Sequence, residues 1–196
     1  AFMFVKGEKS RTRALTVMGF GFIFLGLELM SKGLSPLRTL PEFINLFHSF
    51  KADSFFGVVK VAMVGALLTG VVQSSAATLG ITITLATQGL IDYPTAVALV
   101  LGENVGTTVT ALLASIGASS NAKRAAYAHT LINIVGVMWA TVIFRPYLSI
   151  LAHFSDSTAN MATAIATAHT MFNVINVILF IPFIGYLAKF LCTIVK

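Results

Sequence analysis

Two short polar segments interrupt long apolar runs of this sequence, and they hold most of the side chains that could bind a ligand. The first segment, GVVQSSAATLGI, contains Gln73, Ser74, Ser75 and Thr78. If the flanking runs are helices, the second helix begins here, and its first backbone amides lack partners and carry the positive end of the helix dipole. Such amides, with hydroxyl and amide side chains beside them, favour an anion.

The lengths of the flanking runs indicate how the first segment is placed. Run 77–91 has 15 residues, or about 22 Å of helix at 1.5 Å per residue, and the hydrocarbon layer of a bilayer is about 30 Å thick. We therefore expect a re-entrant hairpin over 55–91 with its tip at 73–76. The alternative is a packing role, because small residues such as Gly65 and Thr69 let membrane helices approach closely.

The second polar segment, GENVGTT, occupies residues 102–108 and predicts a break in a membrane helix. The carbonyl groups that end the first half-helix would form an oxygen-rich pocket for Na⁺ with the side chain of Asn104. The amides that begin the second half-helix would face an anion, together with the hydroxyl groups of Thr107, Thr108 and Thr110. Two polar breaks of this kind are typical of substrate sites in secondary transporters.

Charged residues within the apolar runs need separate interpretations. Glu103 is a possible coupling residue, because a carboxylate beside an anion site needs a cation, a proton or access to solvent. Glu28 and Lys32 are one helical turn apart, which indicates a local ion pair. Lys60 is expected to extend to the membrane surface.

A short internal repeat places a histidine and an asparagine four residues apart in two segments, AHTLIN and AHTMFN. Each pair therefore lies on one face of its helix. We expect His129 and His169 to make helix contacts, with a direct role in ligand or proton binding as the alternative. Asn133, Asn173 and Asn176 are expected to form hydrogen bonds between helices.

Composition indicates that apolar helices position these residues. Of 196 residues, 57% are hydrophobic and 10% are charged, whereas a soluble domain carries about 25% charged residues. We expect an all-α membrane protein that forms a single helical bundle. Besides the hairpin, its expected elements are spanning helices at 14–34, 125–144 and 160–190, a kink at Pro182, an interfacial segment at 35–54 and the broken helix at 93–117.

Several classes of protein do not fit the sequence. The single cysteine, Cys192, excludes a disulfide framework and a cysteine-rich metal site, and neither a transition metal nor an organic cofactor is expected. No HExxH, GxSxG or Walker motif occurs, so we do not expect an enzyme. The net charge of +6 comes from scattered residues, which does not indicate nucleic-acid binding. The sequence begins without a methionine, and we expect a piece of a longer protein.

The positions of lysine and arginine predict the orientation in the membrane. If both ends of this segment are cytoplasmic, basic residues are more numerous on the cytoplasmic side, as the positive-inside rule requires. The expected cytoplasmic residues are Lys6, Lys9, Arg11, Arg13, Lys123, Arg124, Lys189 and Lys196. The expected outer residues are Lys32, Arg38, Lys51 and Arg145.

The segments QSSAATLGI and GENVGTTVTALLAS together resemble the type II sodium-dependent phosphate cotransporters and their bacterial relatives. FLGLELMSKGLSPL and NAKRAAYAHTLINIVG are similar to that family as well, so the resemblance covers nearly the whole chain. It implies two inverted repeats, each with one hairpin, that hold the substrate between them. This chain has one QSS and one GxNxGTT, and it most resembles the C-terminal repeat. A second inverted repeat or a second copy would complete the site.

The resemblance also implies roles for individual residues. Phosphate would be bound by Gln73, Ser74, Ser75, Thr107 and Thr108. Sodium, the coupling ion, would be bound by Gln73, Ser75, Thr78, Asn104, Thr108 and Thr110. The chain departs from the family pattern at Ala76, where a third serine is usual, and at Glu103, where a small residue is usual.

The implied function is sodium-driven import of inorganic phosphate across the plasma (inner) membrane. Sodium would balance the charge of a divalent anion that meets only neutral donors, so each ion would raise the affinity for the other. One alternative is a passive or outward anion pathway. The other is a non-transporting membrane scaffold subunit, in which the polar residues only join helices.

Overall fold

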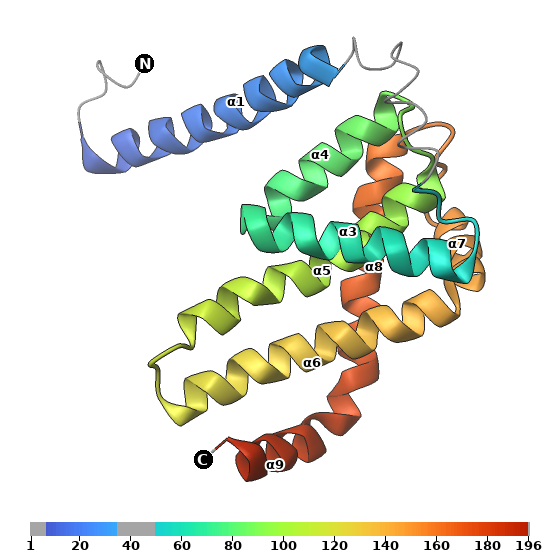
Figure 1. The fold of residues 1–196 in the computed structure, drawn as a ribbon. Helices are drawn as coiled ribbons and strands as arrows, with labels where there is room; N and C mark the ends of the chain where they lie inside the picture. The colour runs from blue at the N-terminus through green and yellow to red at the C-terminus, as the bar shows by residue number, and fades with distance from the viewer. Residues whose placement is uncertain (1–6, 35–49, 196) are drawn as a thin grey trace.

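The computed structural model describes residues 7–34 and 50–195, which are mostly helical and contain no strand (Figure 1). The elements are α1 (Glu8–Leu34), α3 (Phe55–Val72), α4 (Ser75–Thr87), α5 (Tyr93–Ala114), α6 (Ser120–Val142), α7 (Phe144–Ala152), α8 (Met161–Phe180), η3 (Ile181–Phe183) and α9 (Ile184–Ile194). The prediction of an all-α protein is confirmed. Most of the predicted interfacial segment, residues 35–49 of 35–54, lies outside the described residues.

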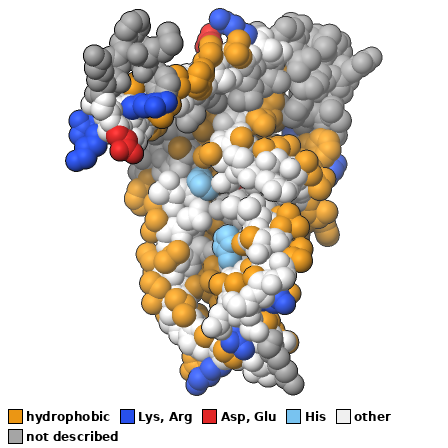
Figure 2. All heavy atoms as spheres, turned by 90° about the vertical axis from the view of Figure 1, so that its left-hand side faces the viewer, with side chains coloured by type: hydrophobic (Ala, Val, Ile, Leu, Met, Phe, Trp, Pro, Cys, Tyr) orange, Lys and Arg blue, Asp and Glu red, His pale blue; other side chains and the backbone are white. Residues whose placement is uncertain are grey.

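Four segments of the described chain are long and apolar enough to cross a membrane: Phe55–Val72, Tyr93–Ala114, Ser120–Val142 and Met161–Ile194. Exposed side chains agree with this, because Leu67 and Val71 on α3 are 71% and 73% exposed. Figure 2 shows lysine and arginine side chains mainly toward the top and bottom of one face, with apolar and uncharged atoms and two histidines between them. The described chain therefore has the surface of a membrane protein.

Side-chain caps fix where most of the helices begin. Each cap accepts a hydrogen bond from the backbone N–H three residues later, which satisfies an amide that the helix leaves unpaired. The caps are Ser54, Ser74, Asp92, Ser119 and Asn160. α1 and α6 begin before the predicted starts at 14 and 125, because their first turns carry charged residues outside the apolar runs. The short helix α7 was not predicted.

α5 is the central helix of the bundle, and it contacts α3, α4, α6 and α8. Its side chains from Ala96 to Leu101 are almost completely buried. α3 lies against α5 with an unusually close approach at three glycines. A Cβ atom there would meet a backbone carbonyl oxygen of the other helix, closer than real Cβ atoms come: Gly65 against Leu99, Gly102 against Ala62, and Gly106 against Ala66.

The predicted helix over 93–117 is present as α5, but the predicted break at 102–108 was wrong. α5 runs without interruption through the second polar segment. Glycine inside a helix costs about 1 kcal/mol relative to alanine. Here the missing Cβ atoms let the α3 backbone come close, as small residues do between membrane helices. Asn104 Nδ2 donates to its own helix at Val100 O over 2.7 Å. The segment is therefore a packing surface, and it has no free helix ends.

The last apolar segment bends at Pro182, as predicted. α8 ends at Phe180 and the 3₁₀ turn η3 follows before α9 begins. Proline has no N–H, so the α-helical hydrogen-bond pattern cannot continue through it. Figure 1 shows α9 turned away from the line of α8, toward the beginning of α6. Arg124 of α6 joins this end to the bundle, because its Nε and Nη2 donate to Val195 O at 3.0 and 2.8 Å.

Candidate functional site

The tip of the α3–α4 hairpin is a tight turn at Gln73 and Ser74, inside the predicted range 73–76. Gln73 has a φ of +54° and is the one non-glycine residue with a positive φ in the described chain. Its N–H donates to Thr69 O at 2.7 Å, which ends α3. Ser74 is already the cap of α4. The turn lies where the sequence predicts it, and its depth in the membrane stays a prediction.

The tip carries several hydrogen-bond donors without partners. Ser74 Oγ accepts from Ala77 N at 3.3 Å, which leaves its hydroxyl proton available. The backbone amides of Ser75 and Ala76, and the side chains of Gln73 and Ser75, have no hydrogen-bond partner within the described residues. Ser74 and Ser75 are half-buried and Gln73 is exposed. This is the donor arrangement that the beginning of a helix offers to an anion.

Thr78 lies behind the tip and joins the two helices of the hairpin. Its hydroxyl donates to Ser74 O at 2.8 Å and accepts from Thr69 Oγ1 at 3.1 Å. Thr69 and Thr78 are completely buried. Thr78 therefore has less hydrogen-bonding capacity left for a ligand than Ser74 or Ser75.

The hairpin tip and the second polar segment lie side by side. A Cβ on Gly106 of α5 would lie 2.7 Å from Thr69 Cβ and 3.0 Å from Gly70 N, at the last turn of α3. A Cβ on Gly70 would in turn lie 3.3 Å from Val109 Cγ2 of α5. The structure thus brings together the two segments that the sequence singled out.

The threonines of α5 mostly bond to their own helix. Thr107 Oγ1 donates to Glu103 O at 2.8 Å, and Thr108 Oγ1 donates to Val105 O at 2.7 Å. Their protons are engaged, so the remaining lone pairs suit a cation better than an anion. Thr108 is buried, Thr107 is half-buried and Thr110 is exposed.

Glu103 is a buried carboxyl group between α4 and α5. Its Oε1 accepts from Thr82 Oγ1 at 2.6 Å, while its Oε2 is buried and has no partner within the described residues. The side chain is 1% exposed, and no basic side chain of the described chain pairs with it. A buried carboxylate is costly unless it is paired or neutralised, so this group needs a further partner.

Asparagine side chains connect α5 and α6 to α8. Asn173 Nδ2 donates to Asn104 Oδ1 at 3.0 Å and to His169 O at 2.9 Å. Asn176 accepts from Trp139 Nε1 at 3.2 Å and donates to Ile132 O of α6 at 3.2 Å. Bonds between helices are thus confirmed for Asn173 and Asn176.

The first copy of the repeat, which contains His129 and Asn133, forms fewer hydrogen bonds to other helices. Asn133 donates to His129 O at 2.9 Å, so its hydrogen bond stays within α6. The imidazoles of His129 and His169 have no hydrogen-bond partner within the described residues, and only their backbone carbonyls accept hydrogen bonds there. Helix contacts of these side chains stay a prediction, with a direct role as the alternative. The expected ion pair of Glu28 and Lys32 is present at 3.1 Å.

Thr69 and Thr82 hold the hairpin together and hold it to α5. The sequence pattern indicated only a packing role for Thr69 and no role for Thr82. Thr82 follows Thr78 by four residues, so both lie on one face of α4, and that spacing is the signal in the sequence.

The sequence profile described as Na⁺/Pi-cotransporter matches residues 42–156. The chain is 29% identical to "Uncharacterized protein YqeW" of Bacillus subtilis, over 84% of this chain and 52% of that protein. It is 28% identical to "Putative inorganic phosphate export protein YjbB" of Escherichia coli, over 91% and 32%, and 35% identical to "Sodium-dependent phosphate transport protein 2C" of Mus musculus, over 74% and 28%. The chain thus spans about half of the first relative's length and a third or less of the other two. No solved structure matches significantly.

Proposed function

We propose that this chain, which belongs to the Na⁺/Pi-cotransporter family, forms one half of a membrane transport pathway for inorganic phosphate. The names of two relatives support this, since one contains phosphate export and the other sodium-dependent phosphate transport. The other half of the pathway would be a second, inverted repeat or a second copy of the chain. Both ends of this segment would be cytoplasmic, as the distribution of lysine and arginine favours.

The hairpin tip is the proposed phosphate site, and its unpaired donors are the observation that carries the proposal. Phosphate would accept hydrogen bonds from the amides of Ser75 and Ala76 and from the side chains of Gln73, Ser74 and Ser75. The positive end of the α4 dipole adds to this attraction. The tip contains neither lysine nor arginine, so a phosphate there needs cations to balance its charge.

Sodium would supply that charge from oxygen ligands around the tip. The proposed ligands are Gln73, Ser75, Thr78, Asn104, Thr108 and Thr110. Thr107 and Thr108 suit sodium better than phosphate, because their protons are engaged within α5. Glu103 is the proposed coupling residue, because its buried Oε2 needs a cationic or donor partner. An inward sodium gradient would then drive phosphate import.

The test is phosphate flux through the full-length protein in proteoliposomes, with radiolabelled phosphate and an imposed sodium gradient. Ser75→Ala removes one donor from the tip, and losing a hydrogen bond to a charged group costs about 2 kcal/mol. We expect the KM for phosphate to rise roughly tenfold or more. Ser149→Ala is the matched control, because Ser149 is exposed on α7 and donates only to Arg145 O. Equal KM values for both variants would refute the phosphate site.

An outward pathway is the second candidate, and it is favoured by the name of the relative YjbB. The same vesicles distinguish the two directions. Import coupled to sodium predicts accumulation of phosphate against its gradient when sodium is placed outside, and none when potassium replaces it. Release from preloaded vesicles that does not depend on sodium would support the outward pathway instead.

A further inference from the structure

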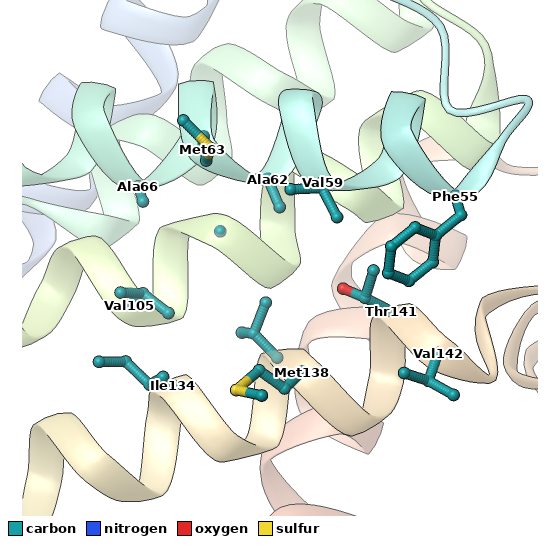
Figure 3. A pocket seen from close by; sticks show the side chains of 12 residues that line it. Phe55, Val59, Ala62, Met63, Ala66, Val105, Ile134, Met138, Thr141 and Val142 are labelled. Atoms are coloured by element: carbon teal, nitrogen blue, oxygen red, sulfur yellow. The ribbon is translucent and has the colours of Figure 1, made fainter.

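An apolar groove lies between α3 and α6, and none of its lining residues is a proposed ligand of phosphate or sodium. Its volume is about 290 Å³. Figure 3 shows side chains of α3 and α6 on its two sides and Val105 of α5 at its floor. Gly102 of α5 also lines the groove, next to Ala62 of α3. Thr141 contributes the one polar side chain of the lining.

The length of the groove along α3 matches one acyl chain. Phe55 and Ala66 line it 11 residues apart on α3, which is about 16 Å of helix at 1.5 Å per residue. That is roughly half of the 30 Å hydrocarbon layer, the depth that one lipid tail occupies.

A cationic side chain lies at one end of the groove. Phe55 and Val142 line that end from α3 and α6. Arg145 follows Val142 by three residues, and its Nη2 donates to Asp53 O at 2.7 Å, just before α3 begins. The guanidinium thus links the two sides of the groove at this end. Arg145 is exposed, and its other donors have no hydrogen-bond partner within the described residues.

We propose that this groove binds one anionic phospholipid, with an acyl chain between α3 and α6 and the headgroup phosphate on the guanidinium of Arg145. Planar guanidinium donors match phosphate oxygens, and charge-assisted hydrogen bonds of this kind are the strong ones. The Asp53 carboxylate lies beside Gly57 in the first turn of α3, since a Cβ on Gly57 would be 3.3 Å from Asp53 Oδ1. This carboxylate repels an anionic headgroup, so the preference for such a headgroup rests on the guanidinium of Arg145.

The experiment measures lipids retained by the purified full-length protein, by native mass spectrometry after titration with phosphatidylglycerol or with phosphatidylcholine. Arg145→Gln should lower the preference for phosphatidylglycerol about fivefold, the value of one basic residue at a membrane surface. Val59→Trp fills the groove and should remove one retained lipid of either kind. Lys189→Gln and Leu67→Trp are the controls, because Lys189 is exposed on α9 and Leu67 is exposed on α3 outside the lining.

Each variant is first checked for a monodisperse, cooperatively melting protein. Should Val59→Trp fail that check, Met138→Trp takes its place, since Met138 lines the groove and is 62% exposed. Unchanged lipid retention in the groove-filling variant would overturn the proposal, as would an unchanged headgroup preference in Arg145→Gln. A groove-filling variant that keeps its lipid but changes the oligomeric state would also overturn it, and would show a protein partner instead.

Discussion

Replacing Gly102 with alanine tests the close contact between α3 and α5. The new Cβ would meet the Ala62 carbonyl oxygen, which is backbone and cannot turn aside as a side chain would. Overpacking of this kind costs about 1–3 kcal/mol, and the better helix propensity of alanine returns up to about 1 kcal/mol. Because the contact is with backbone, we expect the upper end of this cost, a net loss of about 2 kcal/mol and a Tm lower by about 4 °C or more.

The measurement is the Tm of the full-length protein in detergent, with Gly21→Ala as the matched control. Gly21 lies within α1, where no heavy atom of the described chain would come within 4 Å of an added Cβ. The control should keep or raise its Tm, because only the gain in helix propensity remains. A Gly102→Ala protein as stable as the control would refute the close contact. If Gly102→Ala impaired transport but left the Tm unchanged, the result would instead favour a break in α5 at 102–108.

Thr82→Val should lower the free energy of unfolding by about 1–3 kcal/mol, because it leaves both oxygens of the buried Glu103 unpaired. Thr84→Val is its control, since Thr84 donates only within α4, and equal Tm values would contradict the prediction. Asn173→Ala should destabilise the protein by about 1 kcal/mol more than Asn133→Ala in the same melting assay, because it alone removes a bond between helices. A larger loss of stability in Asn133→Ala than in Asn173→Ala would contradict the prediction that the bond from Asn173 to α5 contributes more to stability.

Features of the structure that depend only on residues near one another in the sequence could be predicted. Ser74 caps α4 through Ala77, three residues away, so the predicted beginning of a helix within 73–76 is confirmed. Pro182 bends the last span through its own missing N–H, and that kink was also predicted. The family match confirms the resemblance to the sodium-dependent phosphate cotransporters.

The prediction for the second polar segment was wrong because the conformation of this segment depends on a contact with a residue far away in the sequence. Glycines beside polar residues are typical of a turn, but the same residues suit close helix packing. Close packing is favoured over a turn because the α3 backbone at Ala62 lies against Gly102, and Ala62 is forty residues earlier in the chain. Thr82 and Glu103 were likewise joined by tertiary packing, and no short sequence pattern links them.

The glycine contacts have a mechanical consequence for the hairpin. Gly102 and Gly106 are four residues apart and receive the carbonyl groups of Ala62 and Ala66, which have the same spacing. A slide of α3 along α5 by one residue would press side chains against those carbonyls, and even a four-residue step, about 6 Å, would place one carbonyl against Ala98 or Thr110. α3 and α5 therefore move as one rigid body. Rotation of α4 about Gln73 would have to break the hydrogen bonds between Thr69 and Thr78 and between Thr82 and Glu103, so the tip is fixed to the same body.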